Sequence, residues 1–285
     1  MKRKKYSPKD PCFCGSGRKI KKCHSDVHPD SRAAHLLRNY LSLDKKKEEY
    51  RTKIEQNSPC QKGCFICCHD DFAISEVEFE WIMRAMKKWP AEKVERVYDI
   101  ALQQCQHVME YSPDVWSRLE GDANTDVEVL EKDAYYYANS RKRNVFPCPL
   151  LDVENQSCSV YKERPFICRT HGSFHYGEAE NGKRYICDFI TVNGRFIETH
   201  PDAIEENINI ERISNLEDPY TKEVHSRRPY PIFYWFYLFY KQTGKKIARY
   251  NHDKPLNFDR AIEELNGRIF LDARIDRLLG NLGKR

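Results

Sequence analysis

The stretch CQKGCFICC, residues 60–68, places four cysteine thiols within nine residues. A short run of this kind holds thiols within bonding reach of a metal ion, so it is a strong ligand signal. Four more cysteines follow far along the chain, in the segments FPCPLLD, CSVYKERPFICR and YICDF: Cys148, Cys158, Cys168 and Cys187. The fold must therefore close a long loop onto residues 60–68, and metal binding would supply part of the free energy of that closure.

The composition of the chain is that of a globular protein. Of its 285 residues, 40% are hydrophobic and 32% are charged, which is sufficient to form an apolar core. The most apolar stretch, YPIFYWFYLFY at residues 230–240, is shorter than the roughly 20 residues that a membrane span needs. The basic start MKRKKYSPKD lacks the apolar segment of a secretory signal. These features predict a cytoplasmic protein, in which clustered cysteines are more often metal ligands or redox groups than disulfides.

Helical periodicity dominates the sequence outside the cysteine runs. We expect a helix over residues 31–56, one from the capping box Ser75–Glu78 to Trp89, one opened by Pro90, and one over 126–140. The predicted fold class is mainly α, with irregular, metal-organised loops and short strands. We divide the chain into a zinc module (1–27), a helical linker (28–58), a cysteine-cluster domain with a helical insert (59–190), and a helical C-terminal region that packs on it (191–285).

The segment PCFCGSGRKIKKCH, residues 11–24, carries a second ligand set with the spacing C-x-C-x8-C-H. Zinc binds four nitrogen and sulfur ligands tetrahedrally, and a closed set of four is typical of a structural site. Gly15 and Gly17 permit the backbone reversal that this spacing requires. Three thiolates and one imidazole leave a zinc site with a charge of about −1, and the nearby Lys19, Lys21 and Lys22 would offset it and favour thiolate over thiol. The four candidate ligands are Cys12, Cys14, Cys23 and His24.

Residues 11–24 resemble the SEC-C motif, the small zinc-binding tail of the SecA translocation ATPase. The resemblance implies zinc on the same four side chains and docking to a protein or to the ribosome. The motif is C-terminal in SecA and lies near the N-terminus here. Residues 1–24 hold nine Lys or Arg against one acid, Asp10, so this segment carries +8 and the rest of the chain −3. Such a basic head either binds an anionic partner or is a solvated terminus.

The central cysteines resemble a second family. The pattern C-x3-C-x2-C-C, then C-P-x-L-D, then C-x-V-Y-x-x-R-P-x-x-C-R is similar to the YkgJ-like cysteine-cluster proteins, which chelate zinc or iron. Thiolates suit zinc and iron–sulfur clusters alike. Eight thiols exceed the four that one zinc or one cubane cluster uses, so we expect two metals or one cluster with spare thiols. The metal site implied by the resemblance contains Cys60, Cys64, Cys67, Cys68, Cys148, Cys158 and Cys168, with Cys187 in the eighth position.

Several other side chains near these cysteines have two interpretations. Arg164, with Pro165, either positions the Cys168 loop while its guanidinium offsets thiolate charge, or caps a helix end. Three histidines are either ligands or, as we favour, ordinary hydrogen-bonded side chains: His69, His171 and His175. Cys105 lies on the apolar stripe of a helix, so we expect it in the core and not at a metal.

Two classes of function follow from these patterns. The first is a non-catalytic metalloprotein with a binding or adaptor role, and metal storage or delivery is a variant of it. The second is an iron–sulfur-dependent protein-modifying enzyme, because relatives of flagellin lysine methylase carry a similar cysteine motif. The sequence contains no G-x-G-x-x-G loop that would support the second class. The aromatic run at 234–240 either stacks nucleic-acid bases beside Arg227 and Arg228 or, as its continuity favours, forms a core helix.

Overall fold

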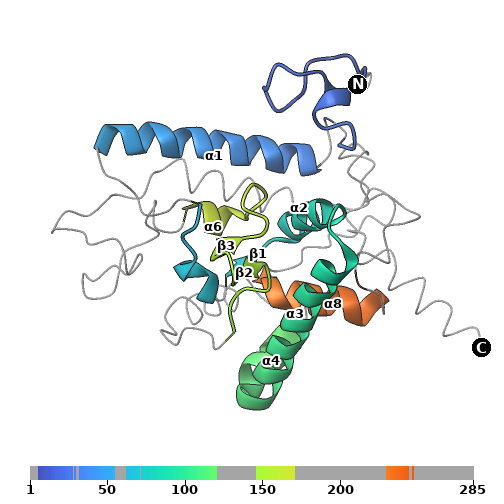
Figure 1. The fold of residues 1–285 in the computed structure, drawn as a ribbon, viewed down its shortest axis with the longest axis vertical. Coiled ribbons are helices and arrows are strands. Elements are labelled where there is room, and N and C mark those ends of the chain that lie inside the picture. The colour runs from blue at the N-terminus through green and yellow to red at the C-terminus, as the bar shows by residue number, and fades with distance from the viewer. Residues whose placement is uncertain are drawn as a thin grey trace, which may run out of the picture.

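The computed structural model describes residues 6–27, 29, 32–54, 62–70, 72–120, 146–170, 229–243 and 246. Within these ranges the chain is mainly helical with a few two-residue strands, which confirms the predicted fold class (Figure 1). The predicted helix over 126–140 lies outside the described residues, and the division into domains stays a prediction. The elements are η1 (Ile20–Lys22), α1 (Arg32–Ile54), η2 (Ile66–His69), β1 (Ala73–Ile74), α2 (Glu76–Met86), α3 (Ala91–Tyr111), α4 (Pro113–Glu120), β2 (Leu151–Asp152), β3 (Ser157–Cys158), α6 (Phe166–Thr170), β4 (Tyr230–Pro231) and α8 (Ile232–Thr243).

Helix α2 begins at the capping box that the sequence predicted. The Ser75 side chain accepts a hydrogen bond from the backbone of Glu78, and the Glu78 carboxylate accepts one from the Ser75 N–H at 2.9 Å. The helix is buried on nearly every side, including Val77, Trp81 and Ile82. It therefore lies in the interior of the molecule, where it contacts both α1 and α8.

The aromatic run of the C-terminal region forms the centre of the hydrophobic core. Trp235, Phe236 and Phe239 on α8 are fully buried. The Trp235 ring stacks on Phe79 of α2 at 5.6 Å between centroids, and Phe236 meets the edge of Tyr98 on α3 at 5.1 Å. Since these rings pack against helices, they are not available to stack on nucleic-acid bases.

A short antiparallel ladder connects the start of α2 to the start of α8. Ala73 pairs with Pro231 and Ile74 with Tyr230, which joins β1 to β4. The indole Nε1–H of Trp235 donates to the carbonyl oxygen of Ile74 at 2.9 Å. These bonds fix α8 beside α2 although about 160 residues separate the two partners in sequence.

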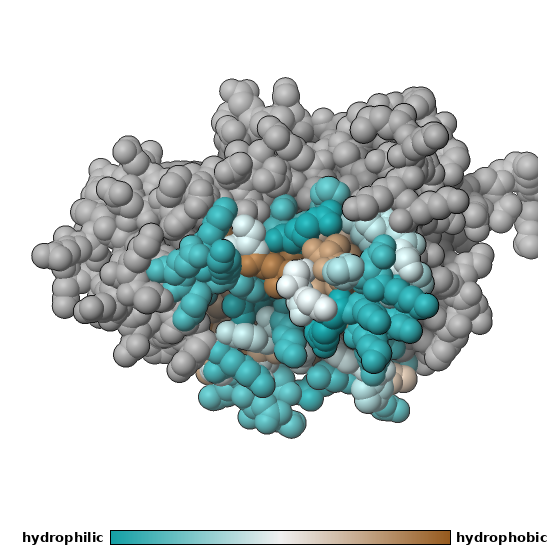
Figure 2. All heavy atoms as spheres, turned by 90° about the horizontal axis from the view of Figure 1, so that it is seen from above, coloured by the Kyte–Doolittle hydropathy of each residue, from teal (hydrophilic) through white to brown (hydrophobic). Residues whose placement is uncertain are grey.

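Helix α1 lies across one side of the molecule, with α6 and α2 beneath it (Figure 1), and it contacts α2 directly. Its buried face contains Leu36, Tyr40 and Leu43, while Lys45 and Glu49 on the outer face form an exposed ion pair at 3.7 Å. The view onto this side shows a mainly hydrophilic surface with a small apolar area (Figure 2). None of the described helices is long and apolar enough to cross a bilayer.

Candidate metal centres

The N-terminal segment reverses direction at two glycines. Gly15 and Gly17 adopt φ angles of +74° and +71°, a left-handed conformation that side chains with a Cβ seldom adopt. The Cys12 N–H then donates to the Arg18 carbonyl at 2.7 Å, which closes the loop. The short 3-10 turn η1 follows immediately and delivers Cys23 back to the start of the loop. Local backbone geometry therefore brings together residues that are about ten positions apart.

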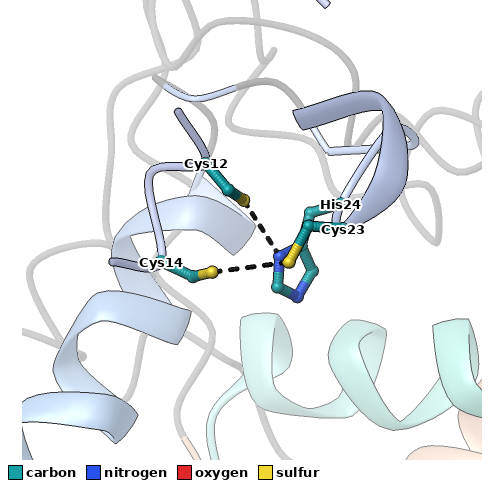
Figure 3. Close-up of side chains that lie close together, drawn as sticks. All are labelled: Cys12, Cys14, Cys23 and His24. Carbon is teal, nitrogen blue, oxygen red and sulfur yellow. Dashed lines mark hydrogen bonds between the residues drawn. The ribbon is translucent and has the colours of Figure 1, made fainter. Parts of the chain in front are cut away.

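Four side chains of this segment point toward one another (Figure 3). The ligand atoms of Cys12, Cys14, Cys23 and His24 all lie within 4.8 Å of one another. The Cys12 Sγ is 3.3 Å from the His24 Nδ1, and the Cys14 Sγ is 3.6 Å from the Cys23 Sγ. A tetrahedral zinc with Zn–S bonds of about 2.3 Å separates its sulfur ligands by about 3.8 Å. The four side chains thus fit one tetrahedral ion with little rearrangement.

The electrostatic environment shifts the pKa values of these candidate ligands in different directions. Burial raises the pKa of the Cys12 thiol to about 12. For Cys14 the effect of burial is outweighed by hydrogen bonding with the side chain and backbone of Ser16, so that its pKa is lowered. Burial, and after it the charge of Arg84, lowers the pKa of His24, which keeps the imidazole neutral and able to bind a metal.

Ser16 is a contributor to this site that the sequence reasoning did not single out. Its Oγ lies 3.2 Å from the Cys14 Sγ and 3.3 Å from the Cys23 Sγ. Hydrogen bonds to thiolate sulfur favour the ligand form of a cysteine. Lys19, Lys21 and Lys22, which the sequence suggested for that purpose, are exposed on the outside of the segment. In the sequence, the feature that could have indicated this role is the position of Ser16 between Gly15 and Gly17.

The N-terminal segment is docked on the helical body. The His24 ring lies 5.4 Å from the Phe13 ring and 6.4 Å from the Trp81 ring of α2. Val27, directly after the ligand set, is 2% exposed and belongs to the main hydrophobic core. The segment that the sequence suggested as a separate basic head, which we define as residues 6–27, is therefore packed against α2.

A charged contact reinforces this docking. The Arg84 guanidinium donates to both carboxylate oxygens of Asp26, each at 2.7 Å. The same guanidinium lies over the Trp81 ring at 4.6 Å, so it is held from two sides. Arg38 of α1 adds a cation–π contact with Phe13 of the head, its guanidinium lying 5.8 Å from the ring centroid. The head thus contacts both α1 and α2.

The central cysteines come from four separate segments that meet beside η2. Cys64 precedes η2, Cys67 and Cys68 lie in it, Cys158 lies in β3, and Cys168 lies in α6. The Cys148 N–H donates to the Cys68 carbonyl at 2.5 Å, which joins the two halves of the cysteine pattern. Leu151 then pairs with Cys158 in the β2–β3 hairpin and donates its N–H to the Cys148 carbonyl at 2.9 Å. Closure of the long loop, which the sequence required, is therefore present in the fold.

The thiols of this region influence one another electrostatically. Burial raises the pKa of Cys168 well above its usual value, and the neighbouring Cys67, Cys148 and Cys158 raise it further. Burial also raises the pKa of Cys158, whereas the charge of Arg164 acts in the opposite direction. Several thiols within each other's electrostatic reach require a cation to become thiolates together, which is the role of a metal ion.

The two sets differ in how closely their ligand atoms converge. Among the residues that the structure describes, only the N-terminal four form a compact group of potential metal ligands. The central thiols are neighbours in a looser arrangement. Cys60 and Cys187, which the resemblance placed in the central set, lie outside the described residues, as do His171 and His175.

The arginines around Cys168 have distinct roles. Arg164 lies over the Tyr161 ring at 3.9 Å and its charge favours the Cys158 thiolate, which agrees with the charge-offsetting interpretation. Arg169 is the more deeply buried of the two, at 4% exposure, and the sequence reasoning did not single it out. In the sequence, Arg169 could have been noticed only as the second arginine of the pattern R-P-x-x-C-R.

Two further predictions concern residues outside the ligand sets. Cys105 on α3 is 2% exposed and belongs to the core, as its place on the apolar stripe predicted. His69 lies at the end of η2 with its ring 6.3 Å from the Phe65 ring. That ring contact fits the interpretation of His69 as an ordinary packed side chain.

Comparison with known proteins bears on the central region. Residues 59–188 match a family model. It is the CxxCxxCC family, described as a "putative zinc- or iron-chelating domain". The match covers just under half of the chain and spans all eight central cysteines, from Cys60 to Cys187. No curated protein and no solved structure matches the chain. The family match and the N-terminal Cys3His group together indicate a metal-binding protein.

Proposed function

We propose that the chain is a two-site metalloprotein with a binding or adaptor role. Cys12, Cys14, Cys23 and His24 hold a structural zinc, and the central thiols hold a second centre of zinc or iron. The observation that carries the proposal is the convergence of the four N-terminal ligand atoms within 4.8 Å. The family match of residues 59–188 supports the central centre independently.

The N-terminal metal has a structural role in this proposal. Four protein ligands complete a tetrahedral shell and leave no position for a substrate or water. The resemblance to SEC-C, which rests on the residues of this segment alone, supports zinc as the metal. When bound, the zinc crosslinks the loop to the turn η1 and so holds the head in the shape that docks on Trp81.

The adaptor role rests on the charge of the head. Five basic side chains on it are exposed: Lys9, Arg18, Lys19, Lys21 and Lys22. The nearby Asp26 is already engaged by Arg84. Because the inner face of the head is packed on α2, the exposed cations present a basic surface suited to an anionic partner such as the ribosome or an acidic protein.

Elemental analysis of the anaerobically purified full chain tests the two sites. We expect Cys14→Ser to lose one equivalent of zinc, and Cys158→Ser to lose metal from the central centre only. Cys105→Ala is the matched control, since Cys105 lies within the family span but in the core, and its metal content should equal that of the wild type. Equal metal content in Cys14→Ser and wild type would refute the N-terminal site.

The spectrum of the same preparation identifies the central metal. A brown protein with broad absorbance near 400 nm contains an iron–sulfur cluster, and would favour the alternative of an iron–sulfur-dependent modifying enzyme related to flagellin lysine methylase. A colourless protein with zinc alone supports the binding role.

Co-sedimentation with ribosomes at low and high salt tests the adaptor role. Replacement of Lys21 and Lys22 by Glu should abolish a salt-sensitive interaction, whereas the same change at Lys45 on α1 should not. Binding that is equal for all three proteins would contradict the role of the basic head.

A further inference from the structure

The α6 helix is too short to be stable without contacts from the rest of the fold. It consists of five residues, Phe166–Thr170, and presents Cys168 to the central thiols. A single helical turn in water is unstable because nucleation costs more than one turn of hydrogen bonds returns. The position of Cys168 must therefore be set by contacts from other elements.

Glu78 of α2 supplies the contact at the start of α6. Its Oε1 accepts hydrogen bonds from the Phe166 N–H at 2.6 Å and from the Tyr40 hydroxyl at 2.9 Å. Its Oε2 accepts from the Ser75 N–H at 2.9 Å and the Ser75 hydroxyl at 2.8 Å. One carboxylate thus joins α1, the start of α2 and the start of α6.

Each oxygen of this carboxylate faces a backbone N–H group, a contact that only an acceptor can make. Glu78 is 4% exposed, and a buried carboxylate is stable only where donors compensate for its lost hydration. Backbone N–H groups donate and cannot accept, and burial holds the pKa of Tyr40 well above its usual value, so its hydroxyl keeps its proton. The four donors therefore match the acceptor positions that the two carboxylate oxygens offer.

A second set of contacts holds the other end of α6. The Arg169 guanidinium donates to the Asp44 carboxylate at 2.5 Å and to the Arg164 carbonyl at 2.8 Å, and lies over the Tyr40 ring at 4.2 Å. The Arg169 carbonyl accepts a hydrogen bond from Lys47 Nζ at 2.9 Å. Cys168 thus lies between two residues whose main-chain groups are each bonded to a buried side chain from another helix.

We infer that Glu78 is a positioning residue of the central metal centre, which fixes Cys168 through the Phe166 N–H while Arg169 anchors the following residue to α1. The inference rests on the proposed function, because it gives Cys168 a metal to bind. Residues that orient a metal ligand without touching the metal contribute substantially to metal affinity. Their loss typically weakens that affinity by 10- to 100-fold.

The change Glu78→Gln keeps the size of the side chain and alters only its charge and hydrogen bonding, so it tests the positioning of α6 without a change in core packing. The amide has one oxygen and one NH₂ group in place of two equivalent oxygens. Placed at Oε1, the NH₂ faces the Phe166 N–H; placed at Oε2, it faces the Ser75 N–H. Either orientation sets donor against donor at one backbone group, and the first releases the start of α6. Ser75→Ala is the matched control, because it weakens the start of α2 but leaves the Phe166 and Tyr40 contacts in place.

The experiment measures how well metal protects individual cysteines in the full-length protein. Wild type, Glu78→Gln and Ser75→Ala are equilibrated at one buffered free zinc concentration and treated with N-ethylmaleimide, and labelling rates are read for each cysteine by peptide mass spectrometry. The negative charge of Glu78 also raises the pKa of Cys168, so each labelling rate is compared with that of the same protein without zinc. We expect the factor by which zinc slows the labelling of Cys168 to be about 10 to 100 times smaller in Glu78→Gln than in wild type. Cys12 in the same molecules reports the N-terminal site and should keep its wild-type rate. Ser75→Ala should leave both rates unchanged.

The outcomes distinguish this inference from the function on which it rests. If neither zinc nor the metal retained on anaerobic purification slows the labelling of Cys168 in wild type, the proposed central centre fails and the inference with it. If wild type is protected and both Glu78→Gln and Glu78→Ala, which removes both oxygens, are protected equally, or if Ser75→Ala exposes Cys168 to the same degree, the inference alone is refuted. Should Glu78→Gln not fold, Asp44→Ala releases the Arg169 end from a half-exposed position, and unchanged Cys168 labelling in that variant is likewise a refutation.

Discussion

Replacing Cys14 with serine removes one of the four N-terminal ligands while changing a single sulfur atom to oxygen. Because small zinc modules lose their fold with their metal, we expect the head to detach from α2 in this variant. Detachment exposes Val27, whose burial contributes about 2 kcal/mol. The half-exposed Asp26–Arg84 pair adds about 0.5 kcal/mol after screening by solvent, and the contact of Arg84 with Trp81 a similar amount.

The sum of about 3 kcal/mol predicts a measurable loss of thermal stability. At roughly 2 to 4 °C per kcal/mol for chains of this size, Tm should fall by about 6 to 12 °C. The assay is thermal unfolding of both proteins in excess zinc, so that the central centre is loaded in each, with tryptophan fluorescence as the probe because Trp81 loses its neighbour His24. A Tm equal to that of wild type would show that the head contributes nothing to the stability of the body, and would refute the structural role of the site.

Three further perturbations have defined outcomes. Zinc affinity of the N-terminal site should fall at least tenfold per unit decrease in pH near neutrality, because Cys12, with its pKa raised to about 12, must release a proton to bind and any other thiol that is protonated adds to the slope; competition with a chromophoric chelator at several pH values measures this. Trp235→Phe removes the bond to the buried Ile74 carbonyl and should cost about 2 to 3 kcal/mol in urea unfolding without altering metal content. Arg84→Met breaks the pair with Asp26 and should cost about 1 kcal/mol, while zinc at the head is retained, as elemental analysis would show.

The helices and the N-terminal ligand group were predictable because their determinants are local. The capping box at Ser75 and Glu78 fixed the start of α2, and the apolar stripe of α3 correctly placed Cys105 in the core. Gly15 and Gly17 indicated the reversal that brings the N-terminal ligands together, since the left-handed backbone they adopt is open to few other residues. In each case the interacting residues lie within about a dozen positions of one another.

Contacts between distant segments were not predictable in the same way. The sequence suggested a basic head with an anionic partner, but not that Val27 and Asp26 would dock it on α2. Periodicity shows which face of α2 is apolar, yet it does not show which of several apolar surfaces will cover that face. The role of Arg169 could not be predicted for the same reason, because only the fold shows that this arginine reaches α1.

Glu78 shows how one residue can satisfy a local and a distant requirement together. A glutamate three residues after a serine is enough to predict the start of a helix. That pattern accounts only for the hydrogen bonds between Oε2 and Ser75. A glutamine at this position also completes a capping box, so the local pattern does not require a charge. The bonds of Oε1 to Tyr40 and Phe166 do require an acceptor that faces two donors, one of them a backbone N–H. The contact that distinguishes glutamate from glutamine here is therefore the one with α6 beside the central thiols. The Glu78→Gln variant measures the part of the role of Glu78 that the capping pattern cannot explain.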